Sequence, residues 1–168
     1  SDGIDEAFDL IAGWASITVH QYPTGMNCLD WIVPEKWYCN EVCLKTVRDE
    51  VVFSSEVDPF HIMSYSLPFK EEVSRDLLFR HLHTSELIEQ AIPIKQTLVY
   101  RDWGLSCSQL RKSSLEEEKY RVFIDSGFSS GVLKVGEVVV PGRTKDTIVL
   151  CSYLDGPGQA SETLSGVL

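Results

Sequence analysis

Hydrophobic residues recur at helical spacing at the start of the chain. They lie three or four positions apart: Ile4, Ala7, Phe8, Ile11 and Trp14. Asp and Glu crowd the first turns, where the helix dipole favours acidic side chains. This pattern predicts an amphipathic helix that ends near Gly13. Residues 17–22 then alternate between apolar and polar, and a Pro-Thr-Gly turn follows, which together predict a short strand.

The pattern changes between residues 27 and 68, where short runs rich in Trp, Val, Ile and Tyr are separated by Pro, Asp and Glu. Such runs predict strands in a small β-rich module, at 31–33, 41–47, 51–53 and 61–67. The next segment returns to helical spacing over 75–82. Ser74 precedes it and is predicted to cap this helix.

The second half of the chain predicts more strands. Residues 95–100 are followed by a segment predicted to turn into a short helix, and three further strands are predicted at 120–125, 132–140 and 147–151. The sequence of 132–140 alternates first and is then wholly apolar, as is typical of a strand that enters a covered sheet.

Composition narrows the class of protein. The chain has 168 residues, and its 43% hydrophobic content predicts a folded globular protein of one full or two small domains. A formal charge of -10 without any basic cluster argues against a nucleic-acid partner. The apolar runs are too short to span a bilayer, and the first residues do not resemble a signal peptide. A soluble, cytoplasmic protein without membrane contact is expected.

The residue types that often carry chemistry give few signals. The five Cys form neither a C-x-x-C nor a set with matching His residues, which argues against a disulfide framework or a zinc knuckle. His81 and His83 are two positions apart, which on a helix points them in different directions. Solvated or capping roles are expected for both, and for His20 and His61. Ser165 lacks a G-x-S-x-G elbow, so a serine hydrolase is not expected.

Several longer motifs resemble a known family. They are W-I-V-P-E-K-W at 31–37, S-Y-S-L-P-F at 64–69, Y-R-D-W-G-L-S-C-S at 100–108, the stretch 120–142 and L-S-G at 164–166. Together they resemble the bacterial aminopeptidase-like family, relatives of the zinc-dependent aminopeptidases that carry an inserted β-rich domain. The chain resembles the N-terminal portion of such proteins.

The resemblance implies a fold and a domain plan. The expected fold class is α/β: a partial phosphorylase/hydrolase-like zinc-exopeptidase sheet with a small inserted β-rich domain. Residues 1–25 and 96–168 are expected to form the partial aminopeptidase-like domain, and residues 26–95 the insertion. The loop residues Asp102, Trp103 and Gly104 match a family signature and are expected to shape a pocket. Aromatic residues of the insertion could line a groove or form its core: Trp31, Trp37, Tyr38, Phe60 and Tyr65.

The zinc ligands that the family implies are replaced in this chain. When L-S-G is aligned, Tyr153 and Gly156 stand in the places of two His, and Glu162 stands in the place of the bridging Asp. A phenol with an ordinary pKa of about 10 is a poor zinc ligand at neutral pH. Asp155 would orient a ligand His, but no His stands at position 153. A surface turn and the first turn of a helix explain these residues better than metal binding does, so no cofactor is expected here, although intact relatives hold zinc.

Three hypotheses follow from the resemblance. The first is an aminopeptidase-like protein that is truncated, degenerate at the metal site and not catalytic by itself. The second is a non-catalytic module that binds a peptide or amino acid, or acts as a scaffold for another chain. The third is a metallopeptidase in which Asp155, Glu162 and residues of a partner complete the site. A half sheet leaves an unpaired edge and an apolar face, so a protein partner or homodimer is expected.

Overall fold

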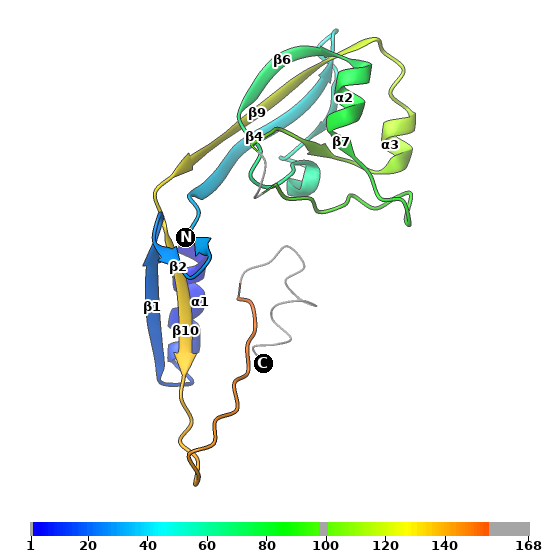
Figure 1. Cartoon of the computed structure of the whole chain (residues 1–168). Coiled ribbons are helices and arrows are strands. Elements are labelled where there is room, and N and C mark those ends of the chain that lie inside the picture. Colours follow the sequence, from blue (N-terminus) through cyan, green and yellow to red (C-terminus); the bar gives the residue numbers. More distant parts are fainter. Residues whose placement is uncertain (1, 98–100, 155–168) are drawn as a thin grey trace. The chain divides into compact units, whose positions relative to one another are not determined.

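The computed structural model of the chain describes residues 2–97 and 101–154 (Figure 1). It contains two compact units, called here the terminal unit (Ser1–Pro34 with Gly131–Leu168) and the central unit (Glu35–Ser130). The described structure mixes helices and strands, with more strand than helix, in several small sheets. The mixed character was predicted, whereas the zinc-exopeptidase sheet and the domain boundaries after residues 25 and 95 stay predictions.

The terminal unit contains one helix against a two-stranded sheet. The predicted first helix is confirmed as α1 (Asp2–Ala12), and the predicted strand after it as β1 (Ile17–Pro23). β1 pairs antiparallel with β10 (Val132–Val138), with Ile17 opposite Val138. A turn at Gly25, where φ is +83°, leads into the two short strands β2 (Asn27–Cys28) and β3 (Trp31–Ile32). None of the described helices is long and apolar enough to cross a membrane.

A close approach at Gly136 packs the helix onto this sheet. A Cβ atom at Gly136 would lie 2.6 Å from Phe8 Cε1 and 2.6 Å from Ile17 Cδ1, so only glycine leaves room for these side chains. Phe8 is buried there, and Lys134 of β10 forms an ion pair with Asp5 of α1. Phe8, on the apolar face of the predicted amphipathic helix, is therefore packed against the sheet.

The central unit is built on a four-stranded antiparallel sheet in the order β5-β4-β9-β6. Its strands are β4 (Lys36–Thr46), β5 (Val51–Ser54), β6 (Phe69–Ser74) and β9 (Lys119–Ser129). β4 and β9 pair along their whole lengths, with one irregularity between Cys39 and Glu41. Every second residue of β9 is buried from Tyr120 to Ser126, because side chains alternate between the two faces of a strand.

Short elements cover one side of that sheet, where Figure 1 shows α2, β7 and α3. They are η1 (Pro59–His61), α2 (Arg75–His81), β7 (Leu82–His83), β8 (Leu105–Ser106) and α3 (Gln109–Ser113), and β7 pairs parallel with β8. The predicted cap of α2 is confirmed, because Leu77 N donates to Ser74 Oγ at 3.2 Å. The core between these layers is large and apolar: Val42, Leu44, Phe53, Val73, Leu78, Leu82, Trp103, Leu105, Cys107, Leu115, Tyr120, Val122 and Ile124.

Two predicted strands are wrong. In place of a strand at 61–67 the chain forms η1, whose first turn is capped by Asp58, and then a loop in which Tyr65 has φ of +68°. The strand lies later, at β6, where charged residues on its outer face hide its pattern from sequence. Residues 147–151 form no strand either. Ile148, Val149 and Leu150 are exposed, and in the described residues no neighbouring strand pairs with them.

Candidate binding cavity beside Trp103

A cavity of about 410 Å³ lies in the central unit, where the end of α2 and β7 meet two loop segments. Two of the three predicted pocket residues line it, Asp102 and Trp103. The other lining residues come from distant parts of the sequence: Met63, Arg80, His81, His83, Lys95, Gln96 and Thr97. The pocket-forming role of this loop stays a prediction, and this cavity is the part of the structure to which it applies.

Trp103 is held rigidly at the wall of the cavity. Its ring is stacked between Phe69 of β6, at a centroid distance of 4.3 Å, and His81 of α2, at 4.2 Å. The interplanar angles are 15° and 8°, and the Trp103 residue is only 8% exposed. Buried aromatic rings in contact on both faces have little freedom to move. The wall is preformed.

Asp102 holds the loop in place through its Oδ1 and its backbone carbonyl, and its Oδ2 lies near His81. Oδ1 accepts a hydrogen bond from Trp103 N at 2.8 Å, and Oδ2 lies 3.5 Å from His81 Nε2. His81 Nδ1 donates to Leu77 O at 3.0 Å, since a carbonyl can only accept. The backbone carbonyl of Asp102 also accepts from Leu67 N at 2.9 Å. Asp102 is thus engaged by the protein itself.

Gly104 lies behind the cavity and does not line it. Its N–H donates to Ser66 Oγ at 3.1 Å, and the Ser66 hydroxyl donates to Met63 O at 2.6 Å. A Cβ atom at Gly104 would lie 2.8 Å from Met63 Cε and 3.2 Å from His83 Nε2. Glycine is favoured because a larger residue would require the end of the Met63 side chain and the His83 ring to shift.

The electrostatics of the cavity are dominated by positive charge. Burial lowers the pKa of His83, and the nearby Lys95, Lys112 and His81 lower it further, while Asp102 acts in the opposite direction. Burial also lowers the pKa of Lys112, whose ammonium donates to Phe79 O and Leu82 O at the end of α2. His83 is therefore a neutral ring in a positive environment at neutral pH.

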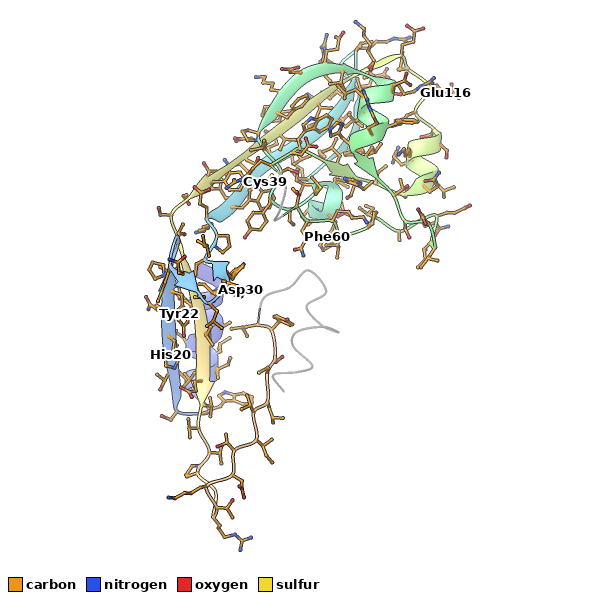
Figure 2. All side chains as sticks on the ribbon, in the orientation of Figure 1. His20, Tyr22, Asp30, Cys39, Phe60 and Glu116 are labelled. Atoms are coloured by element: carbon orange, nitrogen blue, oxygen red, sulfur yellow. The ribbon has the colours of Figure 1, made fainter. Side chains whose placement is uncertain are left out.

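The other two histidines, His20 and His61, do not line the cavity and contact other residues of the protein. His20 Nε2 lies 2.8 Å from Glu137 Oε2 on the exposed surface of the terminal unit, and Figure 2 labels it on β1. This agrees with the expected solvated role. The expectation is wrong for His61, which is 8% exposed, stacks on Phe53 and donates to Ser106 O at 2.8 Å.

The aromatic residues considered for either a groove or a core do not lie together as one set. Trp37 stacks on Tyr65 at 6.0 Å, and Tyr65 contacts Phe128, over which Arg101 lies at 4.0 Å. Trp31 belongs to the other unit, and Phe60, labelled in Figure 2, is a 42% exposed residue of η1. A second hollow lies on the opposite face of the four-stranded sheet, but acidic and basic side chains line it together, and all belong to strands and turns of that sheet.

The positions that stand in place of the family's zinc ligands lie at or beyond the end of the described residues. Tyr153 is 77% exposed in the terminal unit, whereas Asp155, Gly156 and Glu162 lie outside the described residues. Within residues 2–97 and 101–154, no three His, Cys, Asp or Glu side chains come together as metal ligands. An exposed phenol does not fit the place of a zinc ligand, so no chemical step is derived through zinc.

Sequence reasoning missed the cationic side of the cavity. Arg80 and Lys95 were not selected as candidate residues. His81 and His83 were expected to point in different directions, because both were assumed to lie on one continuous helix. The helix ends at His81 and a strand begins at Leu82, so both rings reach the same cavity. The usable signal was the R-H-L-H run directly after a capped helix.

Comparison with known proteins places the chain in a family. A family model described as a domain of unknown function (DUF2172) matches residues 36–127, which is more than half of the chain. The chain belongs to this DUF2172 family. The matched residues cover most of the central unit, including the cavity and the four-stranded sheet.

Two longer proteins are similar to almost all of the DUF2172 chain. A Clostridium acetobutylicum protein named "Putative polysaccharide biosynthesis protein with aminopeptidase-like domain" is 29% identical over 166 residues, which are 99% of this chain and 38% of that protein. A crystal structure described as a "putative peptidase" from the same species has a TM-score of 0.70 and 28% identity, and the match covers 80% of this chain and 32% of that one. The chain thus spans well under half of either protein, and both names agree with the aminopeptidase-like resemblance.

Proposed function

We propose that this chain is part of an aminopeptidase-like protein and has no peptidase activity by itself. The observation that carries the proposal is the match to the Clostridium acetobutylicum protein, because it extends over 99% of this chain. The TM-score of 0.70 to the structure described as a "putative peptidase" supports it. Since the chain spans 38% of the first relative, the activity of a whole relative is not proposed for this stretch alone.

The lack of activity is inferred from the residues that stand in the expected ligand places. Tyr153 offers a phenol, which is not one of the Cys, His, Asp or Glu side chains that usually bind zinc. It is 77% exposed. Glu162 is one methylene longer than the Asp it replaces. The chain is accordingly proposed to hold no co-catalytic zinc pair of its own.

A protein partner or a second copy is proposed for the terminal unit. In the described residues, β1 and β10 each pair with only one strand, so each leaves one row of backbone N–H and C=O groups open. Apolar residues of β10 are also exposed, including Val135 at 46% and Val138 at 45%. Added strands would satisfy the backbone groups and cover this surface together.

A second candidate function is a non-catalytic module that binds a peptide or an amino acid. The preformed cavity beside Trp103 favours it, because an aromatic wall and nearby cations suit a ligand with an apolar part and a carboxylate. The two candidates are compatible, since a binding module could belong to a larger aminopeptidase-like protein.

Activity and zinc content of the purified chain test the main proposal. The chain is incubated with a panel of amino-acid anilides, with and without added zinc, and its metal content is measured by elemental analysis. The Clostridium acetobutylicum relative, 29% identical, serves as the comparison protein under the same conditions. We expect no turnover and no stoichiometric zinc in this chain.

Turnover that depends on zinc would overturn the proposal. The variants Asp155→Asn and Glu162→Gln would then show whether these carboxylates act, and Tyr153→Phe is the matched control because it removes only the phenolic oxygen. Loss of turnover in the carboxylate variants would support the metallopeptidase hypothesis, with a partner or second copy completing the site.

A further inference from the structure

The cavity beside Trp103 differs in charge from the rest of the molecule. The chain carries a formal charge of -10, yet Arg80 and Lys95 line this cavity with a single carboxylate, Asp102. Neither Arg80 nor Lys95 forms an ion pair with a residue in the described part of the chain. An excess of cations in a hollow of an acidic protein is an electrostatic site for an anion.

The one carboxylate of the cavity is already occupied by contacts with the protein. Asp102 Oδ1 accepts from Trp103 N at 2.8 Å, and Oδ2 faces His81 Nε2 at 3.5 Å. In the described residues no ion pair joins Asp102, whose side chain is 54% exposed, to Arg80 or Lys95. The charge of both cations is left for a ligand.

Neutral donors and an apolar wall complete the site. His83 is a neutral ring at neutral pH, since burial and the surrounding cations lower its pKa, and a neutral imidazole keeps one N–H to donate. Met63 and Trp103 line the cavity beside the cations, and because each residue is only 8% exposed they offer a small apolar edge and no open ring face. A ligand with an anionic group and an apolar part would find both kinds of contact.

We propose that this cavity binds a small ligand through an oxyanion group, either a carboxylate or a phosphate. Arg80 supplies a planar fork that suits either oxyanion, Lys95 supplies a point charge, and Met63 and Trp103 contact the apolar part. The proposal is independent of the aminopeptidase proposal, because it depends on residues of the central unit and not on positions 153–162.

Titration calorimetry with three probes tests the site and distinguishes the sources of the oxyanion. The probes are inorganic phosphate, sodium acetate and the amino acid leucine, each at constant ionic strength with the full chain. Binding of phosphate alone would indicate a phosphorylated ligand. Binding of acetate, and tighter binding of leucine, would indicate a carboxylate ligand with an apolar part.

The variants Arg80→Gln and Lys95→Gln should each weaken binding of the probe by about tenfold or more, since a charge-assisted hydrogen bond is lost. Lys70→Gln is the matched control, because Lys70 is a cation of β6 that lies over Phe123, away from the cavity. Circular dichroism of all three variants checks that they fold. The proposal is overturned if no probe binds the folded wild-type chain, or if Lys70→Gln weakens binding as much as Arg80→Gln.

Discussion

The two units of this chain differ in how fully other elements cover their strands. In the central unit, short helices cover one face of a four-stranded sheet. Leu44, Leu78 and Leu105 are fully buried there. The terminal unit packs one helix on two strands, and most residues of β10 are exposed. A binding cavity needs side chains held in fixed positions, and the central unit provides them. We therefore expect the central unit to provide most of the stability and the ligand-binding cavity.

The largest expected contrast is between a buried leucine of the central unit and an exposed leucine of the terminal unit. Leu44→Ala in β4 removes a fully buried side chain and should lower the free energy of unfolding of the central unit by about 2–5 kcal/mol. Leu133→Ala in β10, where Leu133 is 42% exposed, should cost about 0.5 kcal/mol. Hydrogen exchange followed by mass spectrometry reports both units separately. Equal losses of protection in both variants would contradict the comparison.

Replacing one glycine in each unit should have an effect of intermediate size on stability, with a different cause in each unit. Gly104→Ala brings a Cβ to 2.8 Å from Met63 Cε, and we expect it to cost about 1–3 kcal/mol of stability through overpacking. Gly25→Ala meets no atom within 4 Å, so its cost of about 1–2 kcal/mol comes only from the φ of +83°. Thermal unfolding measures both.

A double variant separates these two causes. Met63→Ala removes two of the three atoms that crowd Gly104, so the added cost of Gly104→Ala should shrink in that background. Met63→Ala should leave the cost of Gly25→Ala unchanged, because strain at Gly25 is a property of its own backbone. An unchanged cost of Gly104→Ala with Met63→Ala would show that the crowding is not the cause.

The sequence predicted local structure better than tertiary structure. Helix α1, the Ser74 cap of α2 and strand β9 follow from spacing and capping rules that act within a few residues. Strand β6 was missed because Lys70, Glu71 and Glu72 make it look like a loop, although β9 supplies the partner that stabilises it. Residues 147–151 show the reverse case, in which an apolar run has no partner strand in the described structure.

The candidate site was predicted only in part for the same reason, because tertiary packing brings its residues together. Asp102 and Trp103 could be singled out because they form a short motif. Arg80 lies 22 positions and Lys95 7 positions before Asp102, and both reach the cavity only through packing of α2 and of the loop that leads to Asp102. Hydrophobic periodicity identifies which face of an element is buried, but not which surface side chains converge.

The smallest expected effect is a change in the pH dependence of stability at His83. Burial and the cations around the cavity lower the pKa of His83 below its ordinary value of about 6.5. The groups that face it are His81 on α2, Lys112 on α3, and Lys95 and Asp102 on the loops. Between the lowered pKa and 6.5 the unfolded chain binds a proton that the folded chain does not, so stability falls as the pH drops through this range.

Replacing His83 by Gln should therefore flatten the loss of stability of the central unit as the pH falls below about 6.5, because Gln does not titrate. Urea unfolding at several pH values measures the slope, and His20→Gln in the terminal unit is the matched control, since its ring lies outside the cavity. A bound oxyanion would oppose the same effect, because it favours protonated His83, so acetate or phosphate should reduce the pH dependence in the wild-type chain but not in His83→Gln. An equal slope for wild type and His83→Gln would mean that the positive environment of the cavity is weaker than its lining residues imply.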